Sequence, residues 1–354
     1  MTIALDATPL TVPTGGVARY TWELARALAE THPRDEYWLV SDQPFEVPAG
    51  RPANLHLGSS PANPLERRWW LWGLQKELER RGVELFHGTD FAVPYVARRP
   101  AVMTLHDLSP WMDRRWQPKS RVRARTPRLL RAGLAHMVIT PSHAVRRQAI
   151  AHFGLAADRV VAVPLAAADW VRPRGAVAEG RPYFLFVGTL EPRKGIEALI
   201  EAWRAVRARC DVDLWIAGRV RGDFEAPREE PGLRLLGAAP DAELPRLYSG
   251  ALAFVYPSAY EGFGLPVLEA MQCGTPVITS DDPAIMEVTG GCAIHVRPEA
   301  EPLARAMESV YRNPARFSEL RQRGLERAAQ FTWRETARRT REVYDAAARV
   351  FHGR

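Results

Sequence analysis

Residues 253–280 read AFVYPSAYEGFGLPVLEAMQCGTPVITS, which is the pattern of a strand, a glycine-containing loop, a helix and a second strand. Free amide groups and the positive end of the helix dipole meet at the start of such a helix, and together they favour a bound anion. Two glutamates, Glu261 and Glu269, stand eight residues apart in this stretch. A carboxylate beside a bound phosphate is costly unless it binds hydroxyl groups. The stretch therefore predicts a ligand with both phosphates and sugar hydroxyls.

Outward from this stretch, strand-like and helix-like runs alternate along the chain, which predicts an α/β fold with parallel sheets covered by helices. In the first half we expect strands at 2–7, 37–42, 83–88, 101–107, 136–140 and 159–165. In the second half we expect them at 183–190, 213–218, 233–237, 253–258, 275–280 and 293–297. We expect helices at 17–31, 64–81, roughly 119–134 and 143–152 in the first half, and at 195–209, 241–249, 265–273 and 301–312 in the second. Asp281-Asp282 is expected to form a turn, and residues 314–351 have an almost wholly helical pattern.

The length of 354 residues exceeds what one hydrophobic core usually serves, and the two series of strands predict two doubly wound, Rossmann-like domains. Proline, glycine and charged residues interrupt the pattern near 170–182, where we expect the linker. The predicted domains are therefore 1–172 and 181–330. Ligands of doubly wound domains bind at the carboxyl ends of the strands, so we expect a cleft between the two domains.

Composition excludes several classes of protein. No apolar run approaches the roughly 18 residues that span a bilayer, and the N-terminus lacks the basic region of a signal peptide. Three widely spaced cysteines form neither a disulfide framework nor a zinc pattern. Asp211 and Asp213 have the spacing of a metal–diphosphate site, but they precede a strand rather than follow one. We therefore expect a cytoplasmic protein without a metal site.

A second candidate site lies at 187–203, VGTLEPRKGIEALIEAW. An expected strand ends near Thr189, a loop with Arg193 and Lys194 follows, and a helix begins near Gly195. Two adjacent cations at the mouth of a cleft suit a diphosphate. The alternative is a pair of solvated charges in a loop, but the glutamate stretch also predicts an anion and favours the binding site.

Two further candidates follow strands of the first half. Gly15 and Gly16 stand between the first strand and an amphipathic helix, without the GK[ST] of a Walker loop. They could bind a phosphate, but a tight turn that requires glycine explains them equally well. His106, in TLHDLSP (104–110), comes where a strand ends at the edge that faces the expected cleft. It could contact a sugar hydroxyl, or it could be a structurally satisfied histidine.

Taken together, these motifs resemble the retaining glycosyltransferases of family four, which have the GT-B fold. The resemblance runs through nearly the whole chain and rests on seven stretches: GGVARY (15–20), TLHDLSP (104–110), ITPSHAVRRQAI (139–150), YFLFVGTLEPRKG (183–195), LGAAPDAELPRLY (236–248), EGFGLPVLEAMQCGTPVITS (261–280) and FTWRETA (331–337). The two glutamates eight residues apart, with GFGLP between them, are its most specific part. The resemblance implies two Rossmann-like domains and a final helix, about 333–354, that crosses back to the N-terminal domain.

The resemblance also implies roles for the candidate residues. Arg193 and Lys194 would hold the donor diphosphate, Glu261 would face the donor sugar, and Glu269 would bind the ribose hydroxyls. His106 would contact the transferred sugar. The remaining positions would line the sugar and phosphates, and they are Gly15, Gly16, Thr189, Phe263, Gly264 and Leu265.

The implied reaction is the retaining transfer of a hexosyl residue, of the mannose or glucose type, from a GDP- or UDP-linked donor to a glycan or lipid-linked acceptor. Neither a metal nor another cofactor is expected, because fixed cations and helix amides can stabilise the leaving phosphate. A nucleotide-sugar epimerase or a sugar phosphorylase with the same architecture is the alternative. A nucleic-acid-binding protein is a remote alternative, suggested only by the pI near 9.6.

The net charge of +7 is concentrated in 114–131, RRWQPKSRVRARTPRLLR, which has eight basic and no acidic residues. This segment could be a solvated helical face, or it could bind anionic sugars or the acceptor. It could also contact an anionic membrane at the inner face of the cell, because tryptophans and leucines interleave with its arginines. Trp69 and Trp70, after Arg67 and Arg68, would extend that contact.

Overall fold

The computed structural model describes residues 1–12, 15–61, 63, 65–117, 120–175 and 180–353. Contacts divide the chain into two compact units. The first consists of Met1–Trp111, Pro118–Leu165 and Thr332–Arg354, and the second of Met112–Gln117 and Ala166–Phe331. Apart from Met112–Gln117, the chain passes from the first unit to the second after Leu165, and the C-terminal segment from Thr332 belongs to the first unit.

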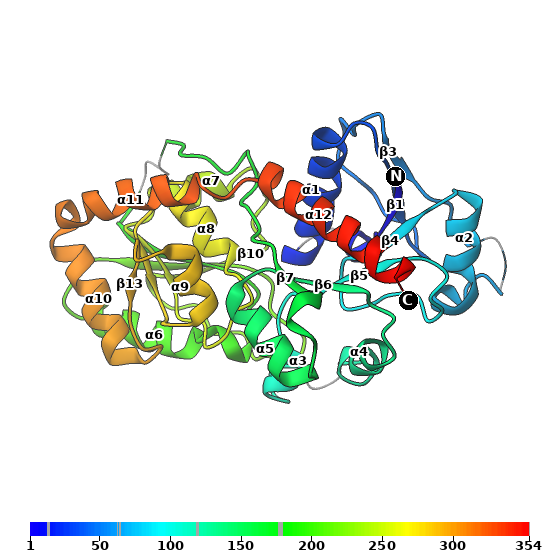
Figure 1. Ribbon diagram of the computed structural model, residues 1–354. Helices are drawn as coiled ribbons and strands as arrows, with labels where there is room; N and C mark the ends of the chain where they lie inside the picture. The colour runs from blue at the N-terminus through cyan, green and yellow to red at the C-terminus, as the bar shows by residue number, and fades with distance from the viewer. Residues whose placement is uncertain (13–14, 62, 64, 118–119, 176–179, 354) are drawn as a thin grey trace. The chain divides into compact units, whose positions relative to one another are not determined.

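The first unit is built on a seven-stranded parallel sheet in the order β3-β2-β1-β4-β5-β6-β7 (Figure 1). Three of its seven strands, β4, β5 and β6, are buried along their whole length, as expected where helices cover both faces of a sheet. The strands are β1 (Thr2–Asp6), β2 (Glu36–Val40), β3 (Leu55–Leu57), β4 (Leu85–Gly88), β5 (Ala101–Thr104), β6 (Met137–Thr140) and β7 (Val160–Ala162).

The helices of the first unit follow the strands in sequence. They are α1 (Gly16–Thr31), the π-turn η2 (Trp69–Gly73), α2 (Leu74–Arg80), α3 (Ser109–Met112), α4 (Val122–Arg131), α5 (His143–Phe153) and α12 (Trp333–His352), with short 3-10 turns η1 (Thr8–Thr11) and η3 (Ala157–Arg159). Ser142 caps α5 by accepting a hydrogen bond from the amide of Val145.

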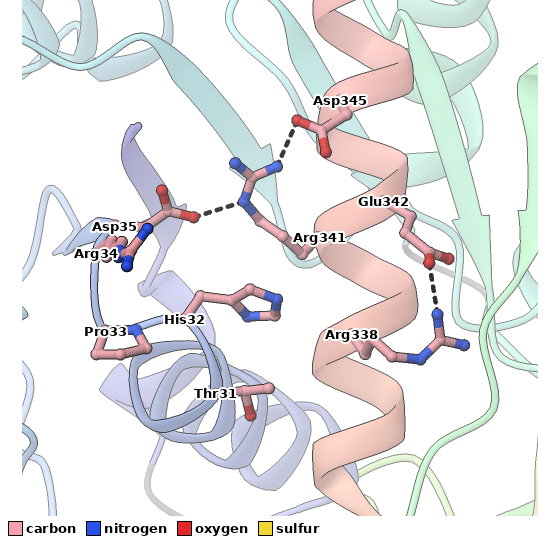
Figure 2. A pocket seen from close by; sticks show the side chains of 9 residues that line it. All are labelled: Thr31, His32, Pro33, Arg34, Asp35, Arg338, Arg341, Glu342 and Asp345. Carbon is pink, nitrogen blue, oxygen red and sulfur yellow. Dashed lines mark hydrogen bonds and ion pairs between the residues drawn. The ribbon is translucent and has the colours of Figure 1, made fainter.

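The final helix, α12, packs beside α1 and places one face in the core of the first unit (Figure 1). Figure 2 shows part of its attachment, where Arg341 bridges Asp35 and Asp345 at 2.5 Å each. The amino group of Met1 also binds Asp35, at 2.8 Å. The helix therefore ties the end of the chain to the start of the same unit, as the resemblance predicted.

The second unit is built on a six-stranded parallel sheet in the order β10-β9-β8-β11-β12-β13. Its strands are β8 (Tyr183–Val187), β9 (Asp213–Ala217), β10 (Leu233–Gly237), β11 (Ala253–Tyr256), β12 (Val277–Thr279) and β13 (Ile294–His295). Its helical segments are η4 (Pro192–Lys194), α6 (Ile196–Arg207), α7 (Leu244–Gly250), α8 (Leu265–Gln272), α9 (Pro283–Thr289), α10 (Ala300–Arg312), η5 (Pro314–Phe317) and α11 (Ser318–Ala328).

The predicted fold class of two doubly wound α/β domains is confirmed. The prediction missed β3, whose three residues are too few for a periodic signal, and α9, which begins directly after the turn expected at Asp281-Asp282. The chain from 314 to 352 is almost wholly helical, as predicted, with residues 329–332 between α11 and α12. No helix within the described ranges is long and apolar enough to cross a membrane.

Candidate functional site

The predicted anion-binding residues of the second unit gather where its strand order reverses. Strand β8 is hydrogen-bonded to β11, although the chain visits two other strands between them. Ligands of doubly wound sheets bind outside the carboxyl ends of the strands at such a switch point. The loop after β8 contains Thr189, Arg193 and Lys194, and the loop after β11 contains Glu261 and the residues up to Leu265. Thr189 is exposed.

The backbone holds these two loops together. Gly195, directly after Lys194, has a φ of 67°, and a Cβ at this position would lie 2.4 Å from the carbonyl oxygen of Pro257. Only glycine therefore allows the loop after β8 to approach β11 so closely. The amide of Ala259 donates to the carbonyl oxygen of Arg193 at 2.8 Å. Arg193 and Lys194 are thereby fixed against the neighbouring loop.

Both cations form ion pairs with Glu261. Lys194 Nζ makes a short contact with Glu261 Oε1, and Arg193 Nη1 lies 3.3 Å from Glu261 Oε2. Lys194 Nζ also donates to the hydroxyl of Tyr256 at 2.6 Å. Arg193 Nη1 donates to the carbonyl oxygen of Tyr260 at 2.8 Å. Lys194 and Glu261 are buried, so water screens their pair weakly.

The charges in this cluster change the pKa of its members. Burial by itself would raise the pKa of Glu261, but attraction to Lys194 and Arg193 outweighs burial and lowers the pKa to about 2. Burial and repulsion by Arg193 lower the pKa of Lys194, and Glu261 acts in the opposite direction. Glu261 is therefore a carboxylate at neutral pH, held by two basic side chains.

Three further side chains support the cluster and were not among the predicted site residues. Glu191 Oε1 pairs with Arg193 Nε at 2.7 Å, and Glu191 Oε2 pairs with Arg221 Nη1 at 2.9 Å. Asp282 Oδ2 accepts a hydrogen bond from the amide of Glu261 at 3.3 Å. Asp282 also caps α9, which the sequence Asp-Asp-Pro could have indicated, since aspartate at the cap and proline at the first helical position are favoured.

The start of α8 offers free amide groups next to this cluster. Gly264 precedes the helix with a φ of 93°, a conformation that favours glycine. Among the hydrogen bonds of the described residues, none is donated by the amides of Phe263, Gly264 or Leu265. Phe263 and Gly264 are buried. Free amides at a helix N-terminus are a ready-made site for an anion.

Glu269 lies one turn along α8 from Leu265, and residues four apart share one face of a helix. The Glu269 side chain is buried, and its Oε2 accepts a hydrogen bond from the hydroxyl of Tyr248 at 3.0 Å. The predicted hydroxyl-binding carboxylate is thus oriented by a buried tyrosine.

The predicted residues of the first unit lie at the carboxyl edge of its own sheet. Gly15 caps α1 with a φ of 118°, and both Gly15 and Gly16 are exposed. His106 follows β5, and its Nε2 lies 2.7 Å from the carbonyl oxygen of Thr89. The imidazole also makes an edge-on contact with the ring of Tyr20, with centroids 4.8 Å apart. His106 is therefore held in one position.

The turn beside His106 was not singled out from the sequence. Phe91 is the one non-glycine residue with positive φ in the described part of the chain, at 54°. Its amide donates to the carbonyl oxygen of Thr104 at 3.1 Å, and Thr89 Oγ1 donates to the carbonyl oxygen of Asp6 at 2.6 Å. Asp90, between Thr89 and Phe91, has a raised pKa because of burial. This strained turn supports His106.

The basic segment 114–131 is divided between the two units. In α4, Leu129 and Leu130 are buried, whereas Arg128 and Arg131 are exposed, as is Arg121, which directly precedes the helix. Residues 118 and 119 of the segment lie outside the described residues. Residues 112–117 belong to the second unit. The leucines that made the segment resemble an interfacial helix therefore pack into the core.

No cluster of three or more metal-ligating side chains occurs in the ranges that the structure covers. Asp213 begins β9 at the amino edge of its sheet, and its Oδ1 lies 3.2 Å from Arg207 Nη1. That position is opposite to the edge where the switch-point loops lie.

Comparisons with families of known proteins match both halves of the chain. The family described as Glycosyltransferase Family 4 matches residues 14–167, and the family described as Glycosyl transferases group 1 matches residues 170–331. The chain is 31% identical to the O-antigen chain mannosyltransferase B of Escherichia coli, and the similarity covers 97% of this chain and 99% of that protein.

Solved structures share the fold. Sucrose-phosphate synthase from Thermosynechococcus elongatus superposes with a TM-score of 0.73 at 21% identity, covering 100% of both chains. Anabaena HepE, solved in complex with UDP and glucose, superposes with a TM-score of 0.71 at 18% identity, covering 98% of this chain and 100% of that chain.

Proposed function

Because the chain belongs to the family-four, group 1 glycosyltransferases, as its motifs predicted, we propose that it transfers a hexosyl residue with retention of anomeric configuration. The donor is a nucleotide-diphosphate sugar linked to GDP or UDP, and the sugar is of the mannose type. The acceptor is a glycan or lipid-linked glycan in polysaccharide biosynthesis. The mannosyltransferase relative, which spans the chain almost end to end, supports the choice of sugar.

The observation that carries this proposal is the arrangement at the β8–β11 switch point. Arg193 and Lys194 converge there on Glu261, beside the free amides at the start of α8. When a nucleoside diphosphate leaves the anomeric carbon, negative charge builds on the leaving phosphate and positive charge builds on the sugar ring. Cations and amides that are fixed in advance stabilise the negative charge on the leaving phosphate, and the Glu261 carboxylate stabilises the positive charge on the sugar ring.

The same arrangement supports a reaction without a metal ion or other cofactor. Two basic side chains and a helix N-terminus supply the positive charge that a divalent cation supplies in other diphosphate sites. For retention, we favour a front-face route in which the leaving phosphate takes the proton of the acceptor hydroxyl. His106 would contact the transferred sugar from the first unit.

A thermal-shift panel of nucleoside diphosphates and their sugars, with and without EDTA, tests this function. A ligand at 100 times its Kd stabilises the native state by about 2.7 kcal/mol. We expect GDP or UDP, and the matching sugar nucleotide, to raise the melting temperature equally in the presence of EDTA. With that donor, NMR of the product should show the retained anomer.

Other outcomes of the same experiment would replace the proposal. An inverted product, or loss of activity in EDTA, would contradict the retaining or metal-independent part. Conversion of the donor sugar without an acceptor would indicate an epimerase, and consumption of glycan with inorganic phosphate would indicate a phosphorylase. Stabilisation by DNA or RNA alone would indicate a nucleic-acid-binding protein.

We also propose that the first unit contacts an anionic membrane, where a lipid-linked acceptor would be found. The exposed arginines of α4 supply charge, and Arg125 of α4 lies 5.5 Å from the ring centroid of Trp70 in the neighbouring π-turn. In that turn, Trp69 is buried, but Trp72 is 54% exposed and Leu71 is 43% exposed. Exposed tryptophan, leucine and arginine together are typical of an interfacial surface.

Flotation with phosphatidylglycerol vesicles at low salt tests the membrane contact. Each arginine near an anionic surface is worth about 1 kcal/mol, so the Arg67→Ala/Arg68→Ala variant should bind about 30-fold more weakly. Arg316→Ala/Arg321→Ala, which removes two exposed arginines of the second unit, is the matched control and should bind like the wild type. Absence of wild-type binding at low salt would end the membrane proposal.

A further inference from the structure

A short excursion of the chain, residues 112–117, is part of the second unit although its sequence neighbours belong to the first. The ring of Trp116 stacks on the ring of Tyr260, with centroids 5.6 Å apart and planes inclined by 16°. The Arg221 guanidinium donates to the carbonyl oxygens of Trp116 and Arg115. These contacts fix the excursion beside the loop that contains Glu261.

The excursion forms one wall of a pocket of about 370 Å³, which is the size of a small-ligand site. Trp116, Phe224 and Pro192 line it with flat, apolar surfaces. Stacking on Tyr260 covers one side of the indole, and Trp116 remains only partly buried, so part of its ring borders the pocket. The pocket therefore offers an aromatic surface rather than a purely polar one.

The charged side chains of the pocket select against an anion. Arg115 lines it together with three carboxylates, those of Glu197, Asp223 and Glu225. Asp223 pairs with Arg221, whereas no ion pair of Glu197 or Glu225 is found within the described residues, and both are exposed. Carboxylates repel phosphate but accept hydrogen bonds from hydroxyl groups. A neutral ligand rich in hydroxyls, with a face that can stack, fits this lining.

We propose that this pocket binds a sugar ring, which stacks on Trp116 and donates hydroxyl hydrogen bonds to Glu197 and Glu225. The role of this sugar ring in the reaction rests on the proposed function, because the pocket adjoins the loops that are proposed to bind the donor. Pro192 directly precedes Arg193, and Tyr260 directly precedes Glu261. Arg221, which holds the excursion, is linked to Arg193 through Glu191. A ring in this pocket thus lies near the loops that hold Arg193 and Glu261, so it would belong to the acceptor or to the donor sugar.

Saturation-transfer NMR with methyl α-D-mannopyranoside and methyl α-D-glucopyranoside, at millimolar concentration and without nucleotide, tests the site directly. We expect a signal from at least one pyranoside with the wild type. Trp116→Ala should bind about tenfold more weakly, which is about 1.4 kcal/mol. Trp116→Phe, which keeps an aromatic face, should retain binding. Trp170→Ala removes a partly buried tryptophan of the second unit that does not line the pocket, and it should leave the signal unchanged.

The absence of any pyranoside signal with the wild type, or an equal signal with Trp116→Ala, would overturn the proposal. Thermal melting shows whether Trp116→Ala is folded, and Glu197→Gln/Glu225→Gln gives a second test that leaves the excursion intact. This double variant should also weaken pyranoside binding, and full binding would contradict the assigned contacts.

Kinetic measurements show whether the sugar ring in the pocket belongs to the acceptor or to the donor. If the pocket holds the acceptor, Trp116→Ala raises the KM for the acceptor at least tenfold and leaves the Kd of the sugar nucleotide unchanged. If it holds the donor sugar, the Kd of the sugar nucleotide rises while that of the nucleoside diphosphate does not. A wild type that binds pyranoside but no nucleotide would refute the proposed function and leave the sugar site in place.

Discussion

We expect the Glu261→Gln variant to lose about 100- to 1,000-fold in kcat while its donor Kd stays within about fivefold of the wild type. Glutamine keeps the shape of the side chain but removes the charge that holds Lys194 and Arg193 in place. Those cations act most strongly when charge develops on the leaving phosphate, so their misplacement affects the transition state more than the bound donor. Steady-state kinetics and calorimetric titration of the donor give the two values.

The matched control for this variant is Glu326→Gln, which makes the same charge change at an exposed position of α11. It should keep wild-type kinetics. If Glu261→Gln kept kcat within threefold, the carboxylate would have no part in the chemistry. If kcat were unchanged and only the donor Kd rose, Glu261 would be a binding residue.

Glu261→Gln should also be less stable, with a definite dependence on pH. Attraction to Lys194 and Arg193 lowers the pKa of Glu261 to about 2 in the folded protein from an ordinary value of 4.5, so the ionised carboxylate stabilises the folded state at neutral pH. Because the folded pKa is the lower one, this stabilisation is complete above about pH 4.5 and disappears as the pH falls toward 2. The difference in unfolding free energy between wild type and variant should therefore shrink in acid over that range.

Much of the fold could be predicted because its elements are local and periodic. Strand β1 was expected at 2–7 and spans Thr2–Asp6, and α8 was expected at 265–273 and spans Leu265–Gln272. Both segments are rich in apolar residues, and Gly264 and Gly274 mark the two ends of α8. One helix was expected over 64–81, whereas Trp69–Gly73 form a π-turn. A π-turn is a helical turn widened by one residue, and its four large residues and glycine still have a helical spacing in the sequence.

The identity of the site residues was easier to predict than the contacts between them. Motif spacing singled out Arg193, Lys194 and Glu261, and the structure joins them by ion pairs across two loops. Whether they bind donor as assigned stays a prediction. Spacing could not show the stack of Trp116 on Tyr260, since these residues are 144 positions apart and meet only through the fold. For the same reason, Trp116 was assigned to an interfacial segment.

The second large effect concerns Glu269, where we expect Glu269→Ala to weaken binding of the nucleoside diphosphate by about 10- to 100-fold. Hydrogen bonds between a carboxylate and hydroxyl groups are worth about 1.5–3 kcal/mol, and alanine removes those to both ribose hydroxyls at once. The position of Glu269 on the same face of α8 as Leu265 supports this role, because that face begins at the free amides. Calorimetric titration with GDP and UDP measures the loss.

Inorganic pyrophosphate is the decisive control, since it has the diphosphate charge but no ribose. Glu269→Ala should leave pyrophosphate affinity unchanged, or raise it slightly, because a carboxylate near the anion has been removed. Tyr248→Phe, which removes the hydroxyl that donates to Glu269 Oε2 but leaves the carboxylate, should lower nucleotide affinity less than Glu269→Ala. An equal loss for pyrophosphate and nucleotide would mean that Glu269 supports the helix start rather than the ribose, and the division of roles between the two glutamates would then be wrong.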